Sequence, residues 1–249
     1  MMSGTRGVVL AIAAALFAGL MTGVGMAQDK GWKPTERWYT WSMKDKPMGY
    51  YHVTLSKTDQ ADAPILLKSE FVLKHKGKNM SLTMEQHCRA DAWLTPMRIV
   101  SRGEGNDEFK TFDAKVTWQE KPGESDGALH TGKFTIATLP AHTVTDFAIF
   151  EIVRSFPPAQ AETLAFNSLE ASELNPKKNH RLAWKADEEL TISGEKKKLR
   201  RYEQSGDGIH PISYWLDDKG ELVRVLVDEE KEYLLSTEAH ARQAMESAQ

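Results

Sequence analysis

Residues 65–88 read ILLKSEFVLKHKGKNMSLTMEQHC, and this stretch decides the fold. Apolar and polar side chains alternate on both sides of Lys76-Gly77-Lys78-Asn79, which has the composition of a turn. Alternation with a period of two places successive side chains on opposite faces of a β-strand. The stretch therefore predicts a β-hairpin with one apolar face and one solvent-exposed face, which favours an antiparallel sheet.

The same alternation recurs along most of the chain. It predicts further strands over residues 37–43, 49–57, 94–102, 109–118, 133–139, 163–169, 180–184, 189–192, 197–203, 212–216, 221–227 and 232–235. Residues 217–220, DDKG, predict a tight turn with glycine in the left-handed conformation. Residues 120–127, EKPGESDG, predict a polar loop, and a short polar helix is expected from about Thr237.

One segment breaks the alternation and predicts an apolar helix over about 144–156. Thr143 and Asp146 have capping-box spacing, and Pro157-Pro158 would end the helix. A helix that is apolar on nearly all sides must be buried on several of them. We therefore predict a mainly β fold, in which a curved antiparallel sheet or incomplete barrel wraps this helix. Any ligand cavity inside the curve would be lined by Phe147, Phe150 and Phe156.

The N-terminus has the layout of a secretory signal peptide. Arg6 precedes an apolar run over residues 7–26, and small residues precede a cleavage site between Ala27 and Gln28. The prediction is a signal peptide over residues 1–27 and a single β-rich domain over 28–249. An uncleaved anchor helix is the alternative, since about 20 apolar residues can span a bilayer. No lipid-accepting cysteine follows, so we expect a periplasmic or secreted protein with no stable membrane span after cleavage.

Composition limits the partners. Without residues 1–27 the chain has 222 residues and loses one arginine, which gives a net charge of −4. A mildly acidic chain gives no reason to expect nucleic acid as a partner. Cys88 is the one cysteine, so no internal disulfide forms. Its strand position predicts a small buried side chain, and a reactive thiol or intermolecular bridge is the alternative.

Motifs for catalysis are missing from the sequence. It has no G-x-S-x-G, and the S-x-x-K match at Ser193 lacks the partner motifs expected downstream. The eight histidines are scattered singly, without metal-ligand spacing, and no glycine-rich phosphate loop opens a helix. We therefore assign no catalytic, cofactor-binding or metal-binding residues and expect a protein that is not an enzyme.

Residues 196–201, KKKLRR, are the densest group of charges. One interpretation is a binding patch for anionic lipid, glycan or an acidic partner. The other is cross-strand pairing with the acidic clusters at residues 187–189 and 228–230. Because alternation sends the cations to both faces of the strand, we favour pairing.

Two segments carry a resemblance to known proteins. They are RWYTWSMKDKPMGYYHVTLS over residues 37–56 and PISYWLDDKGELVRV over residues 211–225, with the apolar helix between them. Together they resemble uncharacterised families of exported bacterial β-proteins, whose fold is similar to that of the periplasmic lipoprotein carriers. The resemblance implies an incomplete antiparallel barrel that holds an acyl chain under helical segments. It implies no catalytic residues.

Three hypotheses follow for the function. The first is an exported, non-enzymatic protein that binds a hydrophobic or acyl small molecule in the concavity of the sheet. The second is a structural or protein-interaction module of the cell envelope, with an envelope protein as partner. The third is a hydrolase with a composite site assembled by folding. A cavity of several hundred Å³ between helix and sheet, the scale of ligand pockets, would favour the first over the second.

Overall fold

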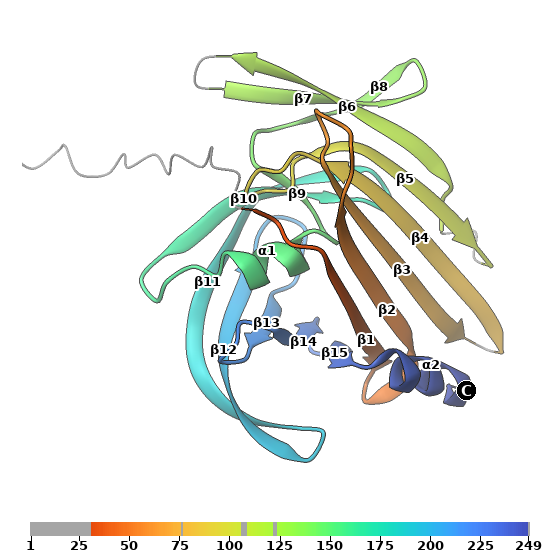
Figure 1. The fold of residues 1–249 in the computed structure, drawn as a ribbon, viewed down its shortest axis with the longest axis vertical. Helices are drawn as coiled ribbons and strands as arrows, with labels where there is room; N and C mark the ends of the chain where they lie inside the picture. Colours follow the sequence, from red (N-terminus) through yellow and green to blue (C-terminus); the bar gives the residue numbers. More distant parts are fainter. Residues whose placement is uncertain (1–30, 76, 106–108, 122–123, 249) are drawn as a thin grey trace, which may run out of the picture.

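The computed structural model describes residues 31–75, 77–105, 109–121 and 124–248, and Figure 1 shows their arrangement. The predicted signal peptide and its cleavage site at Ala27 and Gln28 lie outside these residues. In the described part, one sheet of fifteen strands curls into a nearly closed barrel around a short helix. A second short helix follows the last strand. The prediction of a mainly β fold that wraps an internal helix is confirmed.

The strands follow one another as a meander on each side of a central pair. The first eight are β1 (Thr35–Met43), β2 (Lys46–Lys57), β3 (Ile65–His75), β4 (Lys78–Cys88), β5 (Pro96–Glu104), β6 (Phe112–Lys121), β7 (Glu124–Thr131) and β8 (Phe134–Leu139). The others are β9 (Thr143–Thr145), β10 (Thr163–Glu170), β11 (Asn175–Ile192), β12 (Glu195–Ser205), β13 (Ile212–Leu216), β14 (Leu222–Val227) and β15 (Lys231–Ser236). The helices are α1 (Ile149–Ser155) and α2 (Glu238–Ser247).

The sheet order is β8-β7-β6-β5-β4-β3-β2-β1-β15-β14-β13-β12-β11-β10-β9. The central contact joins the two ends of the domain, because β1 pairs antiparallel with β15 from Trp38↔Ser236 to Met43↔Lys231. All described neighbours are antiparallel except β9 and β10, which are parallel and connected through α1. The sheet therefore ends at two described edge strands, β8 and β9.

The hairpin predicted over residues 65–88 is confirmed as β3 and β4. Its register runs from Ile65↔Cys88 to His75↔Lys78, and the apolar side chains of Leu67 and Met84 are completely buried. The preceding hairpin turns through Lys44 and Asp45, both with positive φ, as a two-residue turn of the primed type requires. Local turn chemistry and alternation thus set the register of these four strands.

Helix α1 is shorter than predicted, and the capping-box interpretation is wrong. Residues 143–145 form β9, which pairs with β10, so the helix begins only at Ile149. The Thr143 hydroxyl donates to the Pro140 carbonyl oxygen, and Ala148 occupies the N-cap position without a side-chain bond. The backbone N–H and C=O groups of residues 143–145, which the sequence pattern assigned to a helical turn, instead form hydrogen bonds with β10.

Two strand boundaries also differ from the prediction. The loop predicted over residues 120–127 is wrong for its described residues, because Glu120 and Lys121 end β6 and β7 begins at Glu124. Gly127 fits this position because a Cβ there would lie 2.9 Å from Val116 Cγ1. The strands predicted over 180–184 and 189–192 are parts of the single strand β11, which is interrupted by a bulge at Trp184 and Ala186.

The main core lies inside the curve of the sheet. Ile149, Ile152 and Val153 of α1 are buried there among inward-facing residues of β1, β2, β3 and β12–β14. On the outside, α2 begins after its N-cap Thr237 and covers Trp38, Tyr50 and Val72 of the first three strands. In the described part of the chain, neither helix has the length or apolar character needed to cross a membrane.

The basic run at residues 196–201 lies on β12, where it faces β11. Lys196 pairs with Glu189 at 2.9 Å, and Arg201 pairs with Glu188 at 3.2 Å. Cross-strand pairing with the acidic cluster at residues 187–189, the favoured interpretation, is confirmed. The described pairs of the run do not include the cluster at 228–230.

Candidate functional site

A cavity of about 360 Å³ lies between α1 and the inner face of the sheet. Its walls come from β2, the β9–α1 connection, β10 and β12–β15, which are distant in sequence and meet only because the sheet curls. The exposed loop between β12 and β13, with Gly208 and His210, contributes to its rim. The lining residues are Tyr51, Asp146, Phe147, Ile149, Phe150, Ser168, Glu170, Lys177, Gln204, Gly208, Ile209, His210, Ile212, Tyr214, Val227, Asp228 and Tyr233.

Five aromatic rings form one connected wall of the cavity. The Tyr51 ring lies 5.3 Å from Phe150, 5.7 Å from Phe147 and 5.8 Å from Tyr233. The Phe150 ring in turn lies 6.1 Å from Tyr214. Such edge-on and stacked contacts hold the rings in fixed relative orientations. The wall is therefore rigid and largely apolar.

Asp146 places one carboxyl group in this apolar setting. Its Oδ1 accepts hydrogen bonds from the backbone N–H groups of Phe147 and Ala171, each at 3.1 Å. Among the described residues, no Lys, Arg or His nitrogen lies within 4.0 Å of the carboxylate. Loss of hydration outweighs the two backbone bonds and raises the pKa of Asp146 to about 7.

The tyrosine hydroxyls bring further polar groups to the cavity. Burial raises the pKa values of Tyr51, Tyr214 and Tyr233, so all three stay protonated at neutral pH. The Tyr214 hydroxyl donates to Gln204 Oε1 at 2.6 Å, and Gln204 Nε2 donates to His180 Nδ1 at 2.9 Å. The Tyr51 hydroxyl is buried and has no hydrogen-bond partner among the residues that the structure describes. A buried hydroxyl in this state is available to a ligand.

Lys177 links two segments at the rim of the cavity. Its Nζ pairs with the Glu170 carboxylate at 3.0 Å and donates to the Gly208 carbonyl oxygen at 3.2 Å. Asp228, also in the lining, pairs with Lys231 at 3.6 Å. Lys177, Glu170 and Asp228 at the rim are therefore each paired with a group of the protein itself.

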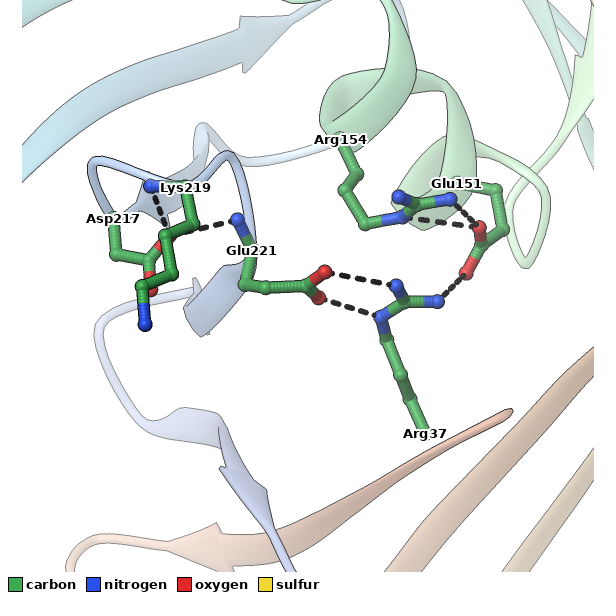
Figure 2. Close-up of polar contacts among 6 residues, drawn as sticks. All are labelled: Arg37, Glu151, Arg154, Asp217, Lys219 and Glu221. Atoms are coloured by element: carbon green, nitrogen blue, oxygen red, sulfur yellow. Dashed lines mark hydrogen bonds and ion pairs between the residues drawn. The ribbon is translucent and has the colours of Figure 1, made fainter. Parts of the chain in front are cut away.

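A network of four charged side chains fixes α1 to the sheet (Figure 2). Glu151 of α1 is 1% exposed and pairs with Arg37 of β1 at 3.4 Å and Arg154 at 2.9 Å. Arg37 also binds Glu221 through two N–H groups, at 2.9 and 3.2 Å. Burial lowers the pKa of Arg37, but the bond to Glu221 and the charge of Glu151 raise it by more. Two carboxylates and two guanidinium groups balance the charge, as burial requires.

The turn between β13 and β14 positions Glu221. Asp217 Oδ1 accepts hydrogen bonds from the backbone N–H groups of Lys219 and Glu221, at 2.9 and 2.8 Å (Figure 2). Gly220 has φ +81°, which confirms the predicted left-handed glycine. The hydrogen bond from Arg37 lowers the pKa of Glu221, so this carboxylate stays ionised. The DDKGE sequence thus both forms the turn and supplies one member of the network.

The three phenylalanines named from the sequence do not lie together. Phe147 and Phe150 line the cavity. Phe156 lies at the C-terminal end of α1, where its ring meets Trp32 edge-on at 5.2 Å, and it is outside the lining. The sequence indicated Asp146 only as a capping residue, and it did not assign Tyr51, Tyr214 or Tyr233 to the cavity. The position of Asp146 next to an apolar helix could have indicated a binding site, because unpaired acids are rare in apolar surroundings.

The described residues contain no group of three His, Cys, Asp or Glu side chains that could hold a metal ion. Cys88 is completely buried, and burial raises the pKa of its thiol. That position agrees with the packing role expected for it. What the site offers is therefore an aromatic cavity with a buried hydroxyl and with one carboxylate, that of Asp146, that has no cationic partner among the described residues.

No protein-family model matches the sequence, and no curated protein matches it. A solved structure with a similar fold is the beta-barrel-like protein of domain of unknown function DUF1849 from Brucella abortus, with a TM-score of 0.52 and 9% sequence identity. The match covers 82% of this chain and 96% of that chain. At this identity the likeness concerns the fold alone, which is β-barrel-like in both proteins.

Proposed function

We propose that this protein is a non-enzymatic binding protein that holds a hydrophobic small molecule, of the lipid or acyl class, in the cavity beside α1. The observation that carries the proposal is the cavity itself. Its volume of about 360 Å³ falls within the range of roughly 300–1,000 Å³ found for ligand sites. A helix packed tightly against the sheet would instead have favoured a purely structural role.

The chemistry of the walls supports the same conclusion. Ligand pockets combine mostly apolar and aromatic linings with a few placed polar groups. Here the aromatic wall lies beside Asp146, and the Tyr51 hydroxyl has no partner within the described part of the chain. The ion pairs of Glu151 hold α1 in place, so the cavity exists before a ligand arrives. Preformed sites lose less entropy on binding.

Export belongs to this proposal. The signal-peptide pattern over residues 1–27 supports a location in the periplasm or outside the cell. The resemblance to periplasmic lipoprotein carriers supports an acyl ligand, since those proteins enclose acyl chains in an incomplete barrel. Cell fractionation with an antibody against the native protein tests the location. Recovery in the cytoplasmic fraction with residues 1–27 retained would contradict it.

Mass spectrometry of organic extracts from the purified native protein tests the ligand. We expect a bound hydrophobic molecule in the wild type and its loss in Ile212→Trp, which fills the cavity. Ile136→Trp is the control, since Ile136 is 46% exposed on β8 and away from the cavity. Repeated absence of any co-purified molecule from the wild type, together with no uptake of added amphiphiles, would overturn the proposal.

A second candidate function is a protein-interaction module of the envelope, and one observation favours it. Phe134 is 77% exposed and Ile136 46% exposed on β8, an edge strand of the sheet. Edge strands can pair with another chain, and proteins usually protect them with charges. Pull-downs from envelope extracts with Phe134→Ser and Ile136→Ser test this candidate; unchanged partners would remove it. The hydrolase hypothesis stays untested.

A further inference from the structure

We propose that the ligand carries a cationic head, an amine or quaternary ammonium group, which binds Asp146 beside the aromatic wall. This inference rests on the proposed function and adds the charge of the ligand to it. The aromatic wall is defined by Tyr51, Phe147, Phe150, Tyr214 and Tyr233. A single-chain amine or ammonium amphiphile is the ligand class that this combination of groups fits.

The charges around the cavity are the first argument. Three carboxylates belong to the described lining, and two of them already have partners: Glu170 pairs with Lys177, and Asp228 with Lys231. Asp146 has no such cation among the described residues. Asp146 is half-buried, and an ionised carboxylate that loses part of its hydration is destabilised unless an opposite charge compensates it. A cationic ligand would supply that charge, whereas a fatty-acid carboxylate would add a second negative charge.

The orientation of the carboxyl group is the second argument. Two backbone N–H groups bind Asp146 Oδ1 and thereby fix the side chain. Its Oδ2 has no hydrogen bond from the described residues, and the residue belongs to the cavity lining. The carboxyl is therefore held ready to accept a hydrogen bond or an ion pair from inside the cavity.

The aromatic wall is the third argument. The faces of aromatic rings carry negative potential and attract cations, and several rings together recognise quaternary ammonium groups. Five rings, from β2, α1, β13, β15 and the connection before α1, converge on this cavity, and three of them are tyrosines that stay neutral at physiological pH. Rings and acid together distinguish a cation from a neutral or anionic head of the same size.

The size of the cavity limits the rest of the ligand. About 360 Å³ lies at the lower end of the range for small-molecule sites, and the apolar lining continues through Ile149, Ile212 and Val227. This volume suits a head group with one short chain and is small for a molecule with two acyl chains.

Isothermal titration calorimetry with three matched probes tests the inference. Decyltrimethylammonium, decyl sulfate and decanol differ in head charge and share one chain. The two charged probes are used below their micelle concentrations and decanol below its solubility limit, with the full-length protein after delipidation. We expect the cation to bind at least about tenfold more tightly than the other two, since tenfold corresponds to about 1.4 kcal/mol. Asp146→Asn should remove that preference, because it keeps the amide oxygen as acceptor and loses the charge.

Ring and charge controls complete the design. Tyr233→Leu should weaken binding of the cation several-fold, and Tyr233→Phe, which keeps the ring, should retain it. Asp62→Asn changes an exposed acid in the loop between β2 and β3 and should leave all three probes unaffected. Circular dichroism and a thermal melt establish that each variant is folded before it is titrated.

The outcomes separate the two proposals. Equal binding of all three probes, tighter binding of the sulfate, or an unchanged preference in Asp146→Asn would overturn the cationic head and leave the binding function standing. Failure of every probe to bind the folded wild type would count against the binding function itself.

Discussion

The guanidinium group of Arg37 on β1 lies 3.4 Å from the Glu151 carboxylate on α1, and this contact ties the internal helix to the first strand of the sheet. Both side chains are at most 10% exposed. Glu151 also binds Arg154, and Arg37 also binds Glu221, so the contact is the centre of a longer chain of charges. The position of α1, and with it one wall of the cavity, depends on these groups.

Glu151→Gln is therefore expected to destabilise the fold strongly. The amide keeps the shape of the side chain but removes the buried carboxylate that pairs with Arg154 and Arg37, so Arg37 is left with Glu221 alone. Removing one partner of a buried ion pair costs about 3–5 kcal/mol. Urea unfolding measures the change, with Asp113→Asn as the control. Asp113 pairs with Arg98 on the surface, where such a pair contributes less than about 1 kcal/mol. Equal losses in the two variants would contradict the assignment.

Asp217→Ala is expected to destabilise the protein by about 1 kcal/mol, the usual contribution of a hydrogen bond of this kind. The change removes the acceptor for two backbone N–H groups and loosens the position of Glu221. Asp218→Ala is the matched control. Asp218 is the exposed neighbour of Asp217, and its side chain forms no hydrogen bond with the described residues. We further expect Asp217→Ala and Glu221→Gln to be non-additive, since both act on the bond to Arg37. Additive losses would show that the turn and the network are independent.

The titration of Asp146 predicts a pH dependence of stability. Its pKa rises from 3.8 to about 7 on folding, so the folded protein keeps a proton that the unfolded chain has already released. The contribution of this group to the free energy of unfolding is therefore fully present below about pH 4, and it is lost as pH rises through about 7. At roughly 1.4 kcal/mol per pKa unit, and because the half-buried Asp146 keeps part of its hydration, the loss is at most a few kcal/mol.

Asp146→Asn removes this titration and leaves the other groups unchanged. We expect the stability of the variant relative to wild type to increase between about pH 4 and about pH 7 and to level off above that. Urea unfolding at a series of pH values measures the difference. A constant difference across the range would mean that the Asp146 carboxyl titrates in the folded protein as it does in the unfolded chain.

Cys88 is expected to be unreactive in the native protein. It is 0% exposed, its thiol contacts the Gln86 carbonyl oxygen, and burial raises the pKa of the thiol. Only the thiolate reacts with disulfide reagents, so labelling should require opening of the structure and be about a thousandfold slower or more than in urea. A cysteine at the exposed position Lys133, in a Cys88→Ala background, is the control and should react at once. Rapid labelling of native Cys88 would contradict the packing role.

The antiparallel sheet could be predicted because its signals are local. In β3 and β4, alternation and a turn at Gly77 determine the strands and their pairing without reference to the rest of the chain. Strand β7 was missed because Ser125, Asp126 and Gly127 have turn composition, although Gly127 is required there by the close approach of β6. The start of α1 was misplaced because pairing of β9 with β10 is a tertiary contact that overrides local helix signals.

The candidate site could be predicted only in part, for the same reason. Phe147 and Phe150 belong to the segment that already appeared apolar, so the sequence indicated them. Tyr51, Tyr214 and Tyr233 lie on β2, β13 and β15, and only the closure of the sheet brings them to Asp146. The partner of Glu151 likewise comes from β1, 114 positions earlier in the chain. Such convergence leaves no spacing pattern in the sequence.

The pairing of β1 with β15 has a consequence for the order in which the molecule is assembled. The first strand begins at Thr35 and its neighbour ends at Ser236, so the central seam of the sheet forms only after nearly the whole chain has been synthesised. Contacts between such distant segments slow folding, because the long loop must close before they form. Until then β1 presents an open edge to other chains. A chain that ends before residue 231 therefore lacks the strand that pairs with β1. The pairing of β15 with β1 is the step that completes the native sheet.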